Sequence, residues 1–322
     1  MHEHIARTLY HLQIHLLYAS MVWVAAWLLT SIRRASATTK YWIWVATALN
    51  FILPMGAVLD KLWAAHLSWA TPLGFFGDAA NSISRDTTAV VLSVVWLLGA
   101  AAMGTRLCLR IRAERRGQRV GRETDSARNS FADEIPIRFT ASNGSPAVDG
   151  VLRPHISLPT GIEQLLSEHE LNAVLVHELA HARRRDNLIR LVHEMALCAL
   201  WFHPLVWITG QRLALYRELS CDEAVIERAQ GEDLVSALAK LANPENELLL
   251  QATATSFISH RLVGLTATLS QPKPRAANAL LAAVFAAALS ASVFGTIAHT
   301  ACCFVSKEAP PKAATCTRAA RP

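Results

Sequence analysis

Long apolar segments constrain this chain most strongly. Residues 9–32, 41–59, 87–105 and 276–305 are mostly apolar, and crossing the hydrocarbon core of a bilayer takes about 20 such residues in a helix. Within lipid, a helix satisfies all of its backbone hydrogen bonds inside one segment. Hydrophobic residues make up 52% of the chain and charged residues 17%, which excludes an ordinary soluble domain. The sequence predicts a mainly α-helical membrane protein with about four transmembrane helices, surrounded by the lipid bilayer.

The charges between the apolar segments predict how the chain is oriented. The first loop carries Arg33, Arg34 and Lys40, whereas the second loop is nearly balanced. Arg residues gather between 106 and 122, directly after the third segment. Because cytoplasmic loops are enriched in Lys and Arg, we expect loops one and three in the cytoplasm and the N-terminus outside. Contact with anionic lipid explains the Arg cluster more simply than a nucleic-acid site does, so no direct nucleic-acid partner is expected.

The predicted spans divide the chain into four parts. These are a three-span membrane region (1–105), a cytoplasmic domain (106–275), a fourth transmembrane helix (276–305) and a short extracytoplasmic tail (306–322). Two strand-like segments, 135–141 and 147–158, precede helical segments in the domain. This order predicts an α+β domain inserted between spans three and four. Residues 191–210 are apolar but interrupted by Pro204, and we interpret them as a helix or broken helix packed at the membrane face.

Residues 177–181 read His-Glu-Leu-Ala-His within a segment that has helical periodicity. Because residues i and i+4 lie on one face of a helix, His177 and His181 can provide two ligands of a tetrahedral zinc ion. Glu178 lies beside the first ligand and can act as general base toward a zinc-bound water. Ser167 and Glu170 have the spacing of a capping box, which predicts the start of this helix. The alternative is a chance occurrence of the pattern, with satisfied histidines in a core helix.

A catalytic zinc site with two His ligands needs a third protein ligand. Glu218 and Asp222 are spaced i, i+4 on one predicted helical face. This spacing permits Glu218 to bind zinc and Asp222 to accept a hydrogen bond from a liganding imidazole, which fixes its tautomer. Spacing alone does not exclude Glu194 or Glu223. Cys221 is a competing sulfur ligand, although a buried structural thiol is its simpler interpretation.

Four segments between residues 135 and 269 occur in the order found in a known family of membrane metallopeptidases. They read Leu-Arg-Pro-His-Ile-Ser-Leu-Pro (152–159), Val-His-Glu-Leu-Ala-His-Ala-Arg-Arg-Arg-Asp-Asn (176–187), Phe-His-Pro-Leu-Val-Trp (202–207) and Arg-Glu-Leu-Ser-Cys-Asp-Glu-Ala-Val (217–225). With these segments the chain resembles the β-lactam-sensing antirepressor proteases of bacteria, the BlaR/MecR type. The resemblance implies a gluzincin-like site, in which His177, His181 and Glu218 bind Zn2+ and Glu178 is the base.

The resemblance also implies a function and a location. It implies a zinc endopeptidase embedded in the bacterial cytoplasmic membrane, with a cytoplasmic protease domain that cleaves a regulatory protein such as a transcriptional repressor. Sensors of this type carry a penicillin-binding domain after the last span, whereas this sequence ends at Pro322. We therefore expect that a separate protein senses the signal, that the loops of this chain sense it, or that the signal is not a β-lactam. A homodimer is compatible with the sequence. The alternatives are a zinc-stabilised membrane signal transducer or scaffold that does not cleave, and a transporter, which the few ionisable residues in the spans disfavour.

Overall fold

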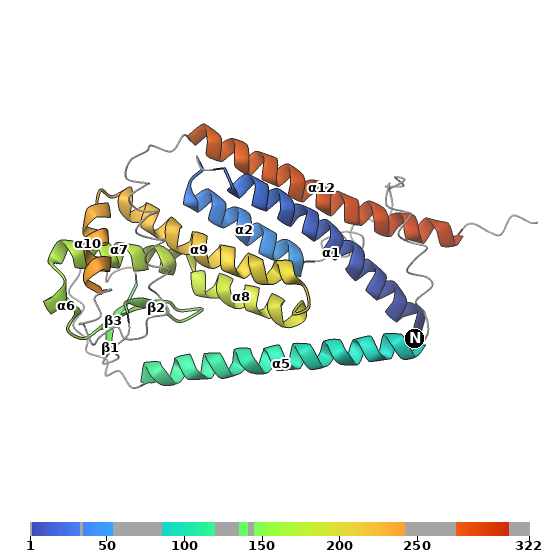
Figure 1. Ribbon diagram of the computed structural model, residues 1–322, viewed down its shortest axis with the longest axis horizontal. Helices are drawn as coiled ribbons and strands as arrows, with labels where there is room; N and C mark the ends of the chain where they lie inside the picture. Colours follow the sequence, from blue (N-terminus) through green and yellow to red (C-terminus); the bar gives the residue numbers. More distant parts are fainter. Residues whose placement is uncertain are drawn as a thin grey trace, which may run out of the picture.

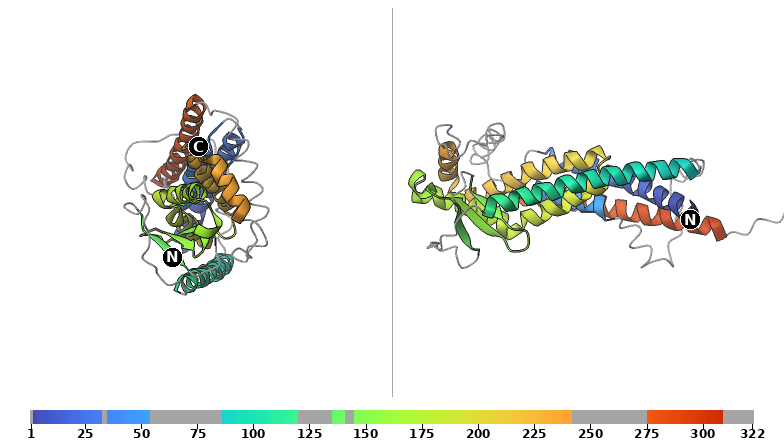
Figure 2. Two further views of the ribbon diagram at one scale, coloured as in Figure 1. Left: turned by 90° about the vertical axis from the view of Figure 1, so that its left-hand side faces the viewer. Right: turned by 90° about the horizontal axis from the view of Figure 1, so that it is seen from below.

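The computed structural model describes residues 2–32, 35–53, 86–119, 135–140, 145–241 and 275–308. Long helices form most of this part, and a small sheet lies at one end (Figure 1). The molecule is elongated, with the sheet at one end and the N-terminus toward the other (Figure 2). The elements are α1 (His2–Thr30), α2 (Ala37–Ile52), α5 (Asp86–Arg119), β1 (Ile137–Thr140), β2 (Ala147–Asp149), β3 (His155–Pro159), α6 (Ile162–Leu165), α7 (Glu168–Arg184), α8 (Asp186–Ala199), α9 (Pro204–Ile226), α10 (Gly231–Leu241) and α12 (Arg275–Glu308).

Three helices in the described part of the chain are long and apolar enough to cross a membrane. Their spanning segments are Leu12–Thr30 in α1, Val90–Ala113 in α5 and Ala276–Phe294 in α12. They correspond to the first, third and fourth predicted spans. The α5 helix continues through the Arg-rich segment as far as Arg119, well past the predicted end of the third span.

The second predicted span coincides with α2, which has 16 residues. The helix is capped at Leu53, one residue before Pro54, as expected because a residue that precedes proline disfavours the α conformation. Residues 54–59 of that predicted span, with the predicted kink at Pro54, lie outside the described residues. The four-span layout and the domain boundaries therefore stay predictions.

One hydrophobic core joins the N-terminal helices to the region expected to form the protease domain. It includes Val22 of α1, Tyr41 and Trp44 of α2, Leu213 of α9 and Phe285 of α12. The helices α1, α2 and α12 lie side by side, and α9 runs from them toward the sheet (Figure 1). Because α9 shares its core with α2, any site on α9 is held in place by the N-terminal helices.

The α5 helix lies along the other side of α8 (Figure 1). The Trp96 indole N–H donates to the Ala199 carbonyl at 2.8 Å, and Arg110 forms an ion pair with Glu194. Apolar side chains from Val90 to Leu98 are mostly exposed. This exposure fits a helix that meets lipid, since a water-soluble surface rarely exposes so continuous an apolar patch.

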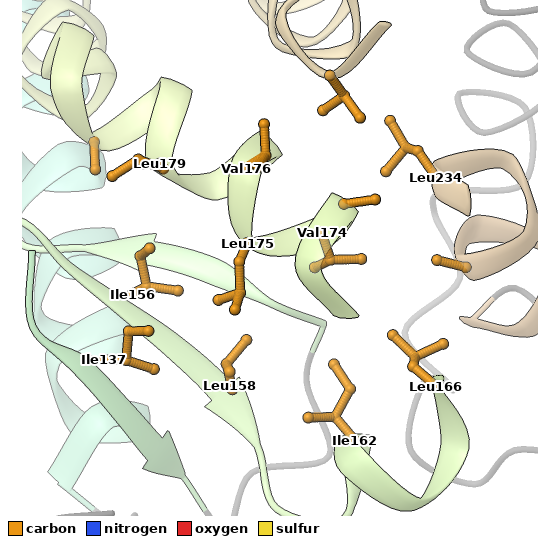
Figure 3. Close-up of a cluster of buried hydrophobic side chains, with 14 of the residues drawn as sticks. Ile137, Ile156, Leu158, Ile162, Leu166, Val174, Leu175, Val176, Leu179 and Leu234 are labelled. Carbon is orange, nitrogen blue, oxygen red and sulfur yellow. The ribbon is translucent and has the colours of Figure 1, made fainter. Parts of the chain in front are cut away.

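The sheet has the strand order β1-β3-β2. The strand-like segment 147–158 contains two strands, because β2 pairs antiparallel with β3, with Val148 opposite Ile156. Strand β1 also forms where it is predicted, but it pairs parallel with β3, with Ile137 opposite Ile156. Ile137, Ile156 and Leu158 pack against Leu175 of α7 in one core (Figure 3). Burying each such side chain contributes about 1.5–3 kcal/mol, so the sheet fixes which face of α7 is turned inward.

The predicted start of α7 is confirmed. The Ser167 hydroxyl accepts from the Glu170 backbone N–H, and the Glu170 carboxylate accepts from the Ser167 N–H, which completes the capping box. At the other end Arg185 has φ 56°, a left-handed conformation that stops α7 and turns the chain directly into α8. Of the two forms left open for 191–210, the structure has the broken helix, because α8 ends at Ala199 and α9 begins at Pro204.

Glu170 also joins α7 to α10, and this predicts a pH-dependent stability. Its carboxylate accepts from Lys240 at 2.7 Å, from the Ser236 hydroxyl at 2.5 Å and from the Ser167 N–H. These hydrogen bonds, that of Lys240 foremost, lower the pKa of Glu170 from 4.5 to about 2. A depressed native pKa stabilises the fold above the unfolded pKa, so this contribution is complete above about pH 4.5 and is lost as the pH falls toward 2.

We expect Glu170→Gln to lower the local free energy of opening of α7 and α10 by about 1–2 kcal/mol near pH 7, since the Lys240 partner is partly solvated. The measurement is hydrogen exchange of these helices between pH 7 and pH 3. The difference from wild type should shrink as the solution is acidified. Glu168→Gln, an exposed position in the first turn of the same helix, is the control. A difference of the same size at every pH would contradict the role given to the Glu170 charge.

Candidate metal centre

The helix α7 carries the His-Glu-x-x-His residues on a buried face. His177 is 4% exposed, Glu178 8% and His181 9%. The opposite face of α7 packs on the sheet, so this polar face is turned toward α9. Buried imidazoles and carboxylates are costly unless partners or a metal satisfy them.

The structure brings His177, His181 and Glu218 together. The two imidazole Nε2 atoms are 3.2 Å apart. The Glu218 Oε2 atom of α9 is 3.5 Å from the Nε2 of His177 and 3.7 Å from that of His181. Ligand atoms bound at zinc distances with tetrahedral angles are separated by about 3.3 Å. The three atoms therefore form a triangle of the size that one metal ion requires.

Cys221 also lies near the two histidines. The ligand atoms of His177, His181 and Cys221 all lie within 4.8 Å of one another. However, the Cys221 sulfur contacts Arg184 Nη2 at 2.9 Å, and burial raises the pKa of its thiol. The geometry thus offers two sets of ligand atoms, the two imidazole nitrogens with the Glu218 oxygen or the same nitrogens with the Cys221 sulfur. The raised pKa of the thiol favours the first set, because a sulfur ligand must be deprotonated.

The other acids that the spacing left open have different partners. Glu194 contacts Arg110 and Arg190, on the side of α8 that faces α5. Glu223 accepts from the Thr38 N–H at 2.9 Å, at the start of α2. The structure therefore brings Glu218, and neither of these two, to the histidines.

Each histidine also contacts a carboxylate through its other ring nitrogen. Asp222 Oδ1 lies 3.0 Å from Nδ1 of His177, in the place that the sequence predicts. Asp186 Oδ2 lies 2.7 Å from Nδ1 of His181. Such contacts hold a proton on Nδ1 and leave the Nε2 lone pair for a metal. The contact of Asp186 with His181 is not predicted from the sequence, although Asp186 lies only five residues after His181, within segment 176–187.

The charges around the triangle favour a cation. Burial opposes the charged form of Glu218, but hydrogen bonds with His177 and His181 outweigh it and hold the pKa of Glu218 well below its ordinary value. Burial likewise lowers the pKa of His181, but its bonds with Asp186, Cys221 and Glu218 raise it well above the usual range. Ionised carboxylates thus converge on two imidazoles. Arg217 offsets part of this negative charge at Glu218 and Arg184 part of it at Asp186, at 3.1 and 2.7 Å, and a divalent cation between the imidazoles would offset more.

We expect Asp222→Asn to weaken metal binding about 10-fold, because loss of such an outer carboxylate typically costs 10–100-fold. The affinity is measured on the full chain in detergent by competition with a chromophoric chelator. Asp233→Asn in the first turn of α10 is the matched control and should bind like wild type. An unchanged affinity in Asp222→Asn would remove this residue from the site.

These features define a class of protein. A buried His-Glu-x-x-His helix, a carboxylate from a second helix and three potential membrane helices are the parts of a membrane-associated metallopeptidase. Residues 9–265 match the BlaR1 peptidase M56 family. The chain therefore belongs to the BlaR1 peptidase M56 family, and the resemblance seen in the sequence is confirmed.

Curated relatives agree with this assignment. The regulatory protein BlaR1 of Bacillus licheniformis is 26% identical over 201 residues, which cover 55% of this chain and 33% of that protein. The methicillin resistance mecR1 protein of Staphylococcus aureus is 24% identical over 97 residues, which cover 30% of this chain and 17% of that protein. The chain thus spans a third or less of the length of these relatives.

Proposed function

We propose that this protein is a membrane zinc endopeptidase that hydrolyses a peptide bond of a regulatory protein at the cytoplasmic face of a bacterial membrane. The triangle formed by His177, His181 and Glu218, with sides of 3.2 to 3.7 Å, carries the proposal. Membership of a peptidase family supports proteolysis, and the name of the relative regulatory protein BlaR1 supports a role in regulation. The substrate in this proposal is a transcriptional repressor.

The residues of the site have distinct roles in this proposal. His177, His181 and Glu218 would hold Zn2+, which when bound polarises a peptide carbonyl and makes water a stronger nucleophile. Glu178 accepts the proton of the attacking water and then delivers it to the leaving amine. Asp222 and Asp186 hold the imidazole rings in the tautomer that turns Nε2 toward the centre.

The arrangement of the helices supports a cytoplasmic site. The Arg-rich end of α5 lies at the same end of the molecule as the sheet, as does the start of α12 (Figure 1). Positive residues next to spans favour the cytoplasm. Because α7 also lies at that end (Figure 1), we place the site on the cytoplasmic side, with the N-terminus outside.

A comparison of cells tests the proposal. Cells that produce the wild-type chain should contain a fragment of a regulatory protein that is missing in cells with Glu178→Gln. Both proteins are expected to bind zinc, which is measured after purification. Identical fragment patterns together with bound zinc would contradict proteolysis and favour a zinc-stabilised signal transducer that does not cleave.

A further inference from the structure

The first turns of α2 reach the metal centre, although α2 is far from it in sequence. Tyr41 is 1% exposed and its ring belongs to the core that α2 shares with α9 and α12. Its hydroxyl donates to Oδ1 of Asp186 at 2.7 Å. The guanidinium of Arg184 lies over the same ring, 4.5 Å from its centroid.

Asp186 uses its two oxygens for different partners. Oδ1 accepts from Tyr41, while Oδ2 contacts Nδ1 of His181 and accepts from Arg184 Nη2, each at 2.7 Å. The residue is 4% exposed, so a lost partner leaves a buried charged oxygen without compensation. A carboxylate that rotates to recover a partner for Oδ1 moves Oδ2 away from His181.

A second contact fixes the same end of α2 to the helix that carries Glu218. The backbone N–H and the hydroxyl of Thr38 both donate to Oε2 of Glu223, each at 2.9 Å. The Thr38 hydroxyl also lies 2.9 Å from the Ser220 hydroxyl. The start of α2 is therefore joined to α9 by Thr38 and to the first residue of α8 by Tyr41.

We propose that Tyr41 is a positioning residue of the metal centre, which acts through Asp186 on the orientation of His181. The proposal rests on the proposed function, because it takes His181 as a metal ligand. It makes α2 a structural part of the protease site. A displacement of α2 relative to α7 therefore changes the alignment of a metal ligand, which gives the N-terminal helices a direct route to the activity of the site.

Tyr41→Phe tests this proposal, because it keeps the ring and removes only the hydroxyl. We expect zinc to bind the purified full chain about 10-fold more weakly, the lower end of what the loss of an outer hydrogen-bond partner costs. The visible spectrum of the Co2+-loaded protein should also change, because the ligand geometry changes. Tyr216→Phe is the matched control, since Tyr216 packs on the same core and its hydroxyl donates to the Thr30 carbonyl instead.

A double-mutant cycle checks the route through Asp186. In an Asp186→Asn background, Tyr41→Phe should cause much less than its own 10-fold loss, because both changes break one chain of contacts. Fully additive losses, or a Tyr41→Phe protein with the zinc affinity and Co2+ spectrum of wild type, would overturn the proposal. These tests measure metal binding and a spectrum, and neither requires a substrate. A failure to find a cleaved substrate would therefore contradict the proposed function without contradicting the positioning role of Tyr41.

Discussion

Glu178→Gln is expected to reduce the rate of peptide-bond cleavage by about 10²–10⁴-fold, the usual contribution of a general acid–base residue. Gln has nearly the same shape and can occupy the same buried position, but it cannot accept the proton of the attacking water. Glu178 is 8% exposed beside His177, so an isosteric change is needed to avoid a packing defect. The measurement is the single-turnover rate with the regulatory substrate, or a peptide from it, on the zinc-loaded full chain.

Two comparisons make this result specific to the base. Zinc affinity should stay at the wild-type value in Glu178→Gln, because this residue is not a ligand in the proposed site. Glu168→Gln, the same chemical change at an exposed position of α7, should keep the wild-type rate. If Glu178→Gln cleaves as fast as wild type, another group takes the proton and the assignment is wrong.

The second large effect is expected at Glu218. Glu218→Gln should weaken zinc binding by more than about 100-fold, because even an outer hydrogen-bond partner can account for 10–100-fold. The neutral amide is a poor zinc ligand and also removes a negative charge that offsets the dication. Cleavage should be lost together with the metal at moderate zinc concentration, and high zinc should restore part of it.

Cys221→Ser separates the two candidates for the third ligand. Cys221 is fully buried on α9, three residues after Glu218, and Ser preserves its size. If Glu218 is the ligand, Cys221→Ser keeps zinc affinity close to wild type while Glu218→Gln loses it. The reverse pattern would show that the metal is bound by the two histidines and the thiol.

The rotation of α9 decides which of its side chains come close to the two histidines, and the sequence alone does not give that rotation. Residues 218 and 221 are about 60° apart around α9, so both lie on the side that faces α7. Packing fixes the rotation of α9 about its axis, since Leu213 is buried against α2 and Val225 in the core that contains α7. Spacing alone therefore left Glu194, Glu218, Glu223 and Cys221 open, and the resemblance to a family favoured Glu218.

The sequence by itself determined the local features of this protein. The apolar segments predict helices in a membrane because length and composition suffice for that inference. The His177–His181 spacing and the Ser167 capping box depend on contacts within one helix, so they could be predicted without the fold. The break before Pro204 has the same local origin.

Only the tertiary structure decided the contacts between distant segments. The parallel pairing of β1 with β3, the approach of Asp186 to His181 and the bond from Tyr41 to Asp186 all depend on how elements pack. Tyr41 and Asp186 are separated by 145 positions, and no periodic pattern in a single chain relates residues that far apart. The spacing of the two proposed histidine ligands is therefore local in origin, whereas the contacts of the carboxylates and the tyrosine around them come from the packing of α2, α7, α8 and α9.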